Sequence, residues 1–298
     1  MWLWSAAAAT PVAWWIYRYA TRPKPKLPYP PGPPGHWLWG NALQLPDIRS
    51  GETFGTKFLE WSYEYGPIFT VKLPFIGRMI VIGDVDAAKH ILITKNYPKS
   101  WTYKSFLPII GERSIIITHG DAWKKQRKAF NPGFTPLFLK DMVSVMSEKM
   151  ERFLQCIDQD VASKIETNML ERSQTFTSDV IVQIAFGEDW GGDKPHPARL
   201  WETELSELLV KAQDPFETFF GFRTKRRIRE LQHLLDEEMF AIVDRLLQSS
   251  SQGTNICSIA IDQLKGPDET LTDDDKITVM HQLKTFHFAG HDTTATTM

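Results

Sequence analysis

The segment 285–298, which reads TFHFAGHDTTATTM, concentrates side chains that can take part in chemistry. A stripe of inward-facing residues is expected along this helix because the following positions recur at helical spacing: Val279, Leu283, Phe286, Gly290 and Thr293. Glycine inside a helix costs about 1 kcal/mol relative to alanine, and a buried threonine can bind the carbonyl four residues earlier, here that of Ala289. These features predict a groove in a buried helix, beside the acid Asp292. The alternative is a close helix crossing at Gly290.

A second group of polar side chains lies in the segment 120–134. Trp123 and Arg127 are four residues apart and therefore share a helix face. The indole N–H and the guanidinium are both donors, so together they suit a buried anion such as a carboxylate. The alternative is a cation–π or packing pair on a surface helix.

His287, His291 and Asp292 indicate a different chemistry, because two histidines four apart and a carboxylate can bind zinc. The glutamate of the HExxH motif is absent, and no further His/Asp cluster completes a ligand set. A metal-dependent hydrolase that uses these three residues remains as an alternative.

A mainly helical scaffold with a small β-sheet near its start is expected to position these residues. Helices are predicted at 54–61, 84–94, 121–130, 137–160, 161–186, 197–213, 224–249 and from 273 to the end. The β-rich runs Ile68–Leu73 and Met79–Ile82 predict a hairpin. Asp84 and Thr272 are the expected N-caps, the latter in a capping box with Asp275.

The start of the chain predicts a membrane anchor. Residues 1–17 carry no charge and hold tryptophans near both ends, and Arg18, Arg22, Lys24 and Lys26 follow. This pattern is typical of a single-pass anchor with a basic cytosolic flank. Alternatives are a signal peptide, although its positive charge would precede the apolar run, and an interfacial or core helix. The proline-rich residues 18–35 are expected to form a semi-rigid hinge.

Charge and cysteine content exclude several classes of protein. The 298 residues carry 34 Lys and Arg against 36 Asp and Glu, a net charge of −2, so no global field recruits nucleic acid. Cys156 and Cys257 form neither a disulfide framework nor a CxxC pair. The basic run 223–229 is expected to be a solvated helix face, with contact to anionic lipid headgroups as the alternative.

Taken in order, these segments resemble the cytochrome P-450 family of haem-thiolate monooxygenases in its membrane-bound eukaryotic form. The pattern Gly120-xx-Trp123-xxx-Arg127-xxxx-Pro132-x-Phe134 is followed far downstream by Ala289-Gly290-x-Asp292-Thr293-Thr294. The apolar start, the proline-rich hinge and the Tyr65-Gly66-Pro67 turn also occur in the order that the family shows. The resemblance implies the cytochrome P-450 fold, with 36–298 as an incomplete catalytic domain that ends within the distal (I) helix.

The resemblance also implies roles for the two groups of residues. Trp123 and Arg127 would donate to a propionate of haem b, and Ala289 and Gly290 would lie over its distal face. Thr293 would hydrogen-bond dioxygen at the haem, and Asp292 would help to relay protons. The implied reaction is hydroxylation or epoxidation of a lipophilic small molecule in specialised metabolism. Electrons would come from an NADPH-dependent cytochrome reductase, at the cytosolic face of the endoplasmic reticulum membrane.

The sequence departs from the family at the iron ligand. The family's cysteinate lies in a Phe-x-x-Gly-x-x-x-Cys-x-Gly loop that follows a Glu-x-x-Arg helix, and neither pattern occurs here. Neither Cys156 nor Cys257 has the flanking glycines, so no metal ligand is assigned. We therefore expect an N-terminal portion of such an enzyme that is inactive by itself. A non-catalytic, membrane-tethered pseudo-enzyme or interaction protein is the alternative.

Overall fold

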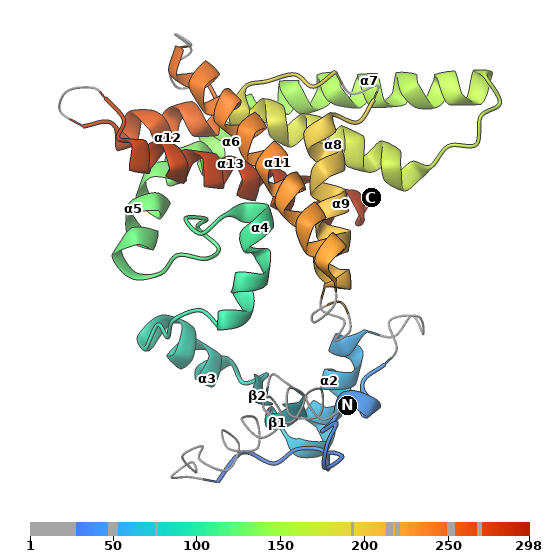
Figure 1. Cartoon of the computed structure of the whole chain (residues 1–298), viewed down its shortest axis with the longest axis vertical. Coiled ribbons are helices and arrows are strands. Elements are labelled where there is room, and N and C mark those ends of the chain that lie inside the picture. The colour runs from blue at the N-terminus through green and yellow to red at the C-terminus, as the bar shows by residue number, and fades with distance from the viewer. Residues whose placement is uncertain are drawn as a thin grey trace, which may run out of the picture. The chain divides into compact units, whose positions relative to one another are not determined.

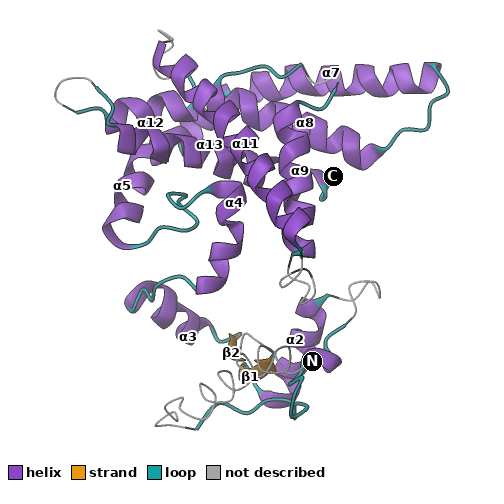
Figure 2. Cartoon of the chain, viewed as in Figure 1, coloured by secondary structure: helices purple, strands orange, loops and turns teal. Residues whose placement is uncertain are grey.

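The computed structural model describes residues 28–46, 53–74, 77–191, 194–212, 217, 221–248, 254–266 and 270–298. The predicted anchor 1–17 and the first part of the hinge lie outside the described residues. Within the described ranges, no helix is both long enough and apolar enough to cross a bilayer. The chain divides into two compact units, residues 1–97 and 98–298. Helix dominates and one small antiparallel sheet is present, as predicted (Figure 2).

The first unit is built around the predicted hairpin. Strand β1 (Ile68–Leu73) pairs antiparallel with β2 (Gly77–Ile82). Helix α2 (Phe54–Tyr65) precedes them and ends at Gly66, whose φ of 94° favours glycine. The other elements of this unit are η1 (Ala42–Gln44), α3 (Val85–Lys89) and the π-helical turn η3 (His90–Thr94). Asp84 caps α3 as predicted, since its carboxylate accepts from the Ala87 amide at 2.7 Å.

The described end of the predicted hinge is fastened to β1. The Pro31 carbonyl accepts from the Thr70 amide at 2.8 Å. The Asn41 side chain donates to the Pro33 carbonyl at 3.1 Å and accepts from the Lys72 amide at 2.8 Å. Proline lacks an N–H but its carbonyl still accepts, so a proline-rich segment can pair through one edge. The carbonyls of Pro31 and Pro33 are therefore bound to other residues of the first unit.

The second unit is almost entirely helical. Its elements are η4 (Trp101–Phe106), α4 (Leu107–Ile110), α5 (Gly120–Phe130), η5 (Asn131–Phe134), α6 (Pro136–Asp141), α7 (Val143–Ala162), α8 (Met169–Phe186), α9 (Pro197–Lys211), α11 (Phe222–Gln248), α12 (Ile256–Leu264) and α13 (Asp273–Ala295). Helix α13 lies among α8, α11 and α12 and contacts each of them (Figure 1). Val182, Leu235 and Leu283 from three of these helices are fully buried in one core. Helix α13, which carries most of the candidate functional residues, therefore lies at the centre of the second unit.

Several predicted helix boundaries are wrong. The predicted helix 137–160 is two helices with a break at Met142, which packs with Phe138 against the core. The predicted helix 161–186 begins only at Met169, because Lys164 adopts a φ of 55° and reverses the chain after α7. Asn168 then caps α8. Neither break contains glycine or proline, so packing rather than local sequence decides both. Helix α12 was not predicted, nor were η4 and α4.

Thr272 caps α13 as predicted, with one difference. Its hydroxyl accepts from the Asp275 amide at 3.1 Å. The Asp275 carboxylate, however, accepts from the Thr272 hydroxyl and from the Lys125 ammonium. The second half of the predicted capping box is therefore replaced by a contact with α5.

Candidate functional site

The two groups of residues singled out by sequence lie on helices that touch. The Lys125 ammonium of α5 is 2.6 Å from the Asp275 carboxylate in the first turn of α13. Farther along both helices, the rings of Phe130 and Phe286 pack edge to face with centroids 5.5 Å apart. α5 is thus fixed to α13 by an ion pair and by an aromatic contact.

Trp123 and Arg127 are both exposed on α5. Among the described residues, neither side chain makes a hydrogen bond or an ion pair, and the guanidinium does not stack on the indole ring. The cation–π pair that was the alternative is therefore not formed in the described part of the chain. What the helix presents is two donor groups without acceptors, which suits an anion.

The turn of α13 from Ala289 to Thr293 has the predicted internal hydrogen bond. The Thr293 hydroxyl donates to the Ala289 carbonyl at 2.8 Å. Val279 and Leu283 are fully buried, but Ala289, Asp292 and Thr293 are exposed. The expectation that Thr293 continues the buried stripe is therefore wrong for the described chain, because the side of α13 that carries it is uncovered.

Asp292 is held by neighbouring helices although it is exposed. Its carboxylate accepts from the Gln174 amide nitrogen of α8 at 3.1 Å. The Gln174 side-chain oxygen accepts in turn from the Arg199 guanidinium of α9 at 3.2 Å. This chain of donors fixes one carboxylate oxygen of Asp292.

Gly290 allows a close crossing of two helices. A Cβ at this position would lie 2.6 Å from Cγ1 and 3.0 Å from Cβ of Ile181 on α8. Such separations are shorter than any van der Waals contact between carbons, so α8 can approach only a glycine. The alternative of a close helix crossing is thus what the geometry supports at this residue.

His287 and His291 meet Glu202 of α9 instead of Asp292. The relative exposures of these three residues are 0%, 3% and 1%. Nδ1 of His287 lies 2.7 Å from Oε2 of Glu202, and Nε2 of the same ring lies 2.9 Å from Oγ of Ser178. The two imidazole rings stack with centroids 4.7 Å apart. Glu202 was missed because it is 85 residues from His287 and no spacing motif links them.

The distances in this cluster are those of hydrogen bonds. Two ligands about 2.05 Å from one tetrahedral zinc lie roughly 3.3 Å apart, well beyond the 2.7 Å between His287 and Glu202. Both ring nitrogens of His287 are already engaged, and Asp292 is exposed elsewhere. The predicted His287, His291 and Asp292 ligand set is therefore not assembled.

Farther back on α13, a buried polar face holds the segment 108–118. The Arg113 amide donates to Nδ1 of His281 at 3.2 Å, and the Ile115 amide donates to Gln282 at 3.0 Å. The Lys284 ammonium lies 2.6 Å from the Asp236 carboxylate of α11 and 3.2 Å from the Pro108 carbonyl. Burial lowers the pKa of Lys284 and lowers that of His281 to about 4. Sequence reasoning missed this face, since charged residues in a helix usually indicate an exposed side.

Both cysteines are described, and both are buried. Cys156 lies on α7 and Cys257 on α12, where complete burial raises the pKa of the Cys257 thiol. The thiolate form is therefore disfavoured at Cys257, and neither side chain belongs to the exposed part of α5 or α13.

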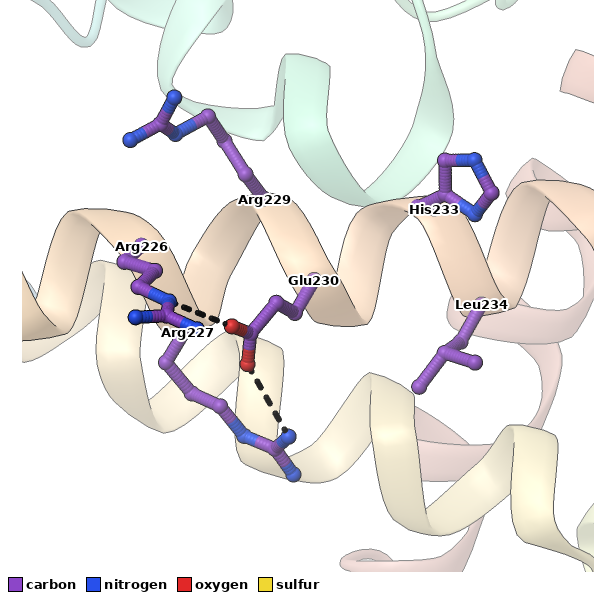
Figure 3. A pocket seen from close by; sticks show the side chains of 6 residues that line it. All are labelled: Arg226, Arg227, Arg229, Glu230, His233 and Leu234. Atoms are coloured by element: carbon purple, nitrogen blue, oxygen red, sulfur yellow. Dashed lines mark hydrogen bonds and ion pairs between the residues drawn. The ribbon is translucent and has the colours of Figure 1, made fainter.

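A hollow of about 710 Å³ along α11 is lined by charged side chains of the predicted basic run (Figure 3). Arg226 and Arg227 both reach the Glu230 carboxylate, and Arg227 also binds Glu204 of α9 with two hydrogen bonds. Arg226 and Arg227, two of the five cations of the run, are thus paired with carboxylates of the protein. This geometry agrees with a solvated helix face.

Comparisons with known proteins agree with the architecture. Residues 30–298 match the family described as Cytochrome P450. The chain is 25% identical over 281 residues to human cytochrome P-450 4Z1, covering 89% of this chain and 54% of the relative. It is 24% identical over 273 residues to cytochrome P-450 709B1 of Arabidopsis thaliana, covering 85% and 51%. The chain thus spans about half the length of these curated relatives.

A solved structure has the same fold. Retinoic acid bound cyanobacterial CYP120A1 superposes with a TM-score of 0.64 at 22% sequence identity, over 90% of this chain and 58% of that one. Helices α5 and α13, with their donor pair and their Ala289–Thr293 turn, occur within the matched family region. The chain belongs to the cytochrome P-450 family.

Proposed function

We propose that this chain forms the distal part of a haem-dependent cytochrome P-450 monooxygenase. One observation carries the proposal: two donors on α5 without an acceptor among the described residues, and an exposed Ala289–Asp292–Thr293 turn on α13, lie on two helices in direct contact. The family implies haem b, which has two carboxylates and a broad apolar face.

The donor set fits the carboxylates of haem. Trp123 and Arg127 can only donate, and within the described residues they have no acceptor of their own. Ala289 offers a small apolar surface on the exposed turn of α13. Gly290 would contribute by letting α8 approach, since the space at its Cα is taken by Ile181. These residues therefore suit the propionates and one face of haem b.

When bound, haem supplies the redox chemistry for insertion of one oxygen atom into an unreactive bond. Asp292 and Thr293 are proposed to move protons at the distal face. The Asp292 carboxylate is oriented by Gln174 and has its other oxygen available. The Thr293 hydroxyl donates to the Ala289 carbonyl, so its lone pairs can accept a hydrogen bond from an incoming donor.

The thiolate that the family uses as iron ligand would have to come from a residue that this sequence does not contain. Cys257 is completely buried on α12, and Cys156 is buried on α7. The 298-residue chain is therefore proposed not to catalyse the reaction by itself.

The wider biological setting is proposed from the sequence. The uncharged segment 1–17 and its basic flank support an anchor in the endoplasmic reticulum membrane, with the folded units facing the cytosol. A lipophilic substrate and an NADPH-dependent cytochrome reductase are the partners that the family suggests. A role in specialised metabolism is proposed from the sequence alone, since a relative such as cytochrome P-450 monooxygenase 128 of Postia placenta is named only as a monooxygenase.

Binding of haemin and of its dimethyl ester tests the donor pair. The ester lacks carboxylates, so Arg127→Gln should weaken binding of haemin about tenfold and leave binding of the ester unchanged. Lys128→Gln, which removes the next cation on α5, should affect neither ligand. Equal weakening of both ligands, or failure of the unaltered chain to bind haemin, would contradict the proposal.

A further inference from the structure

Three helices meet at the buried Glu202 side chain. Oε2 accepts from Nδ1 of His287, and Oε1 lies 3.5 Å from Nδ1 of His291. Nδ1 of His291 also donates to the His287 carbonyl at 2.7 Å, because a carbonyl can only accept. Ser178 of α8 closes the cluster on the far side of His287.

We propose that Glu202 is a positioning residue that sets the rotation of the α13 turn carrying Asp292 and Thr293. The inference rests on the proposed role of these two residues at the distal haem face. Glu202 touches neither of them and acts through the two histidines.

Helix geometry connects the two sets of side chains. His287 and His291 are four residues apart and share one face of α13, which Glu202 contacts from α9. Successive residues are separated by about 100° around a helix, so Asp292 and Thr293 project about 100° and 200° away from His291. Fixing the histidine face therefore fixes the direction in which the acid and the hydroxyl point.

Helix α8 fixes the depth of the same turn, and its side chains Gln174 and Ser178 also hold Asp292 and His287. The Thr177 hydroxyl donates to the His291 carbonyl at 2.8 Å, and Ile181 packs on the bare Cα of Gly290. A main-chain carbonyl and a glycine offer little resistance to rotation about the helix axis. The two imidazole rings provide that resistance because they are wedged between α8 and α9.

The unbalanced bonding of Glu202 favours a positioning role over simple stabilisation. Its Oε1 atom is buried and has no hydrogen-bond partner among the residues that the structure describes. A buried carboxylate with an unsatisfied oxygen lowers stability relative to a well-packed apolar side chain. A site selected for stability alone would be expected to hold leucine or methionine here.

Local hydrogen exchange tests the inference without haem, so its failure is distinguishable from failure of the proposed function. In Glu202→Met, which removes both histidine contacts, amides 287–293 should exchange at least tenfold faster than in the unaltered chain. Amides of α12, which lies in the same unit, should change much less. Glu202→Gln keeps an acceptor for His287 and should restore most of the protection.

Glu204→Gln is the matched control, because Glu204 lies on the same helix but pairs with Arg227 near the surface. It should leave amides 287–293 unchanged. Equal acceleration in α12 and α13 would mean that Glu202 only stabilises the unit and would overturn the inference. If Glu202→Met does not fold, Glu202→Gln should still speed exchange of 287–293 about threefold relative to Glu204→Gln, and no local difference would overturn the inference.

Discussion

Two groups of side chains on α13 differ in their burial. The buried group is polar and almost completely hydrogen-bonded within the described chain: His281, Gln282, Lys284, Thr285, His287 and His291. The exposed group consists of Ala289, Asp292 and Thr293. Asp292 follows Thr285 by seven residues and lies on the same face, so burial of that face changes along the helix. The exposed group holds the residues proposed to act in the reaction, and the buried group is proposed to orient them.

Residues of a chemical motif can be recognised from their local spacing in the sequence, whereas the residues that position them cannot. Asp292 and Thr293 belong to a short local pattern. Lys284 and His287 find their partners Asp236 and Glu202 on other helices, 48 and 85 residues away. If the two groups have these separate roles, substitutions in the buried group should change stability much more than substitutions in the exposed group.

The largest effect is expected for Lys284→Met. The substitution removes the partner of the Asp236 carboxylate and a bond to the Pro108 carbonyl, so it should lower the free energy of unfolding by about 3 kcal/mol. Urea denaturation measures this loss. Lys276→Met is the control, because Lys276 forms a surface pair with Asp273 on the same helix and should change stability by less than about 0.5 kcal/mol. Similar losses of unfolding free energy in both variants would contradict the claim that the buried group contributes more to stability.

Low pH should reduce the stability of the folded protein through His281, a member of the buried group. Its pKa is about 4 in the folded protein against 6.5 ordinarily, so between these values the unfolded chain binds a proton that the folded chain does not. Stability should therefore fall as the pH drops from 6.5 to 4, by about 2 kcal/mol once solvent screening is allowed for. His281→Asn should show a shallower decline over this range and the same slope as the unaltered chain above pH 7. If stability changed equally with pH in His281→Asn and in the unaltered chain, His281 would not be the group responsible.

Gly290→Ala tests the close contact between α13 and Ile181 of α8. The added methyl group would collide with Ile181, at a cost of about 2 kcal/mol, while better helix propensity returns about 1 kcal/mol. A net loss of about 1 kcal/mol is expected in urea denaturation. The double variant Gly290→Ala, Ile181→Ala should lose less than the sum of the two single variants, and strict additivity would argue against contact.

The smallest effect is expected from two threonines on α13. Both hydroxyls donate to the carbonyl four residues earlier, but Thr285 is buried 2.7 Å from the Ser114 hydroxyl and Thr293 is exposed. Thr285→Val should cost about 1 kcal/mol, and Thr293→Val less than about 0.5 kcal/mol, in thermal or urea unfolding. A larger loss at position 293 would reverse the comparison.

The scaffold was predicted from sequence wherever local signals suffice. The hairpin at 68–82 and the caps Asp84 and Thr272 follow from β-branched runs and from side chains that accept hydrogen bonds from helix amides. The boundary after α7 was not predictable, because a lysine at positive φ has no compositional signal. Helix α12 was missed because its nine residues are apolar on nearly every side, which weakens the helical period.

The site was predicted only in part, because local spacing identifies motif residues but not the helices that pack around them. The motif residues on α5 and α13 were found from their spacing, and the structure brings their helices together. The exposure of Thr293 and the partnership of His287 with Glu202 depend on which other helices cover each side of α13. Tertiary packing of this kind has no local pattern from which it could be deduced.

The most direct test of the account is a carbon monoxide difference spectrum of the reduced, haemin-loaded 298-residue chain. The central claim is that this chain carries distal-side residues of a cytochrome P-450 but no cysteine able to ligate the iron. The account predicts no Soret band of thiolate-ligated haem. Appearance of that band, and its loss in Cys156→Ser or Cys257→Ser, would contradict the claim.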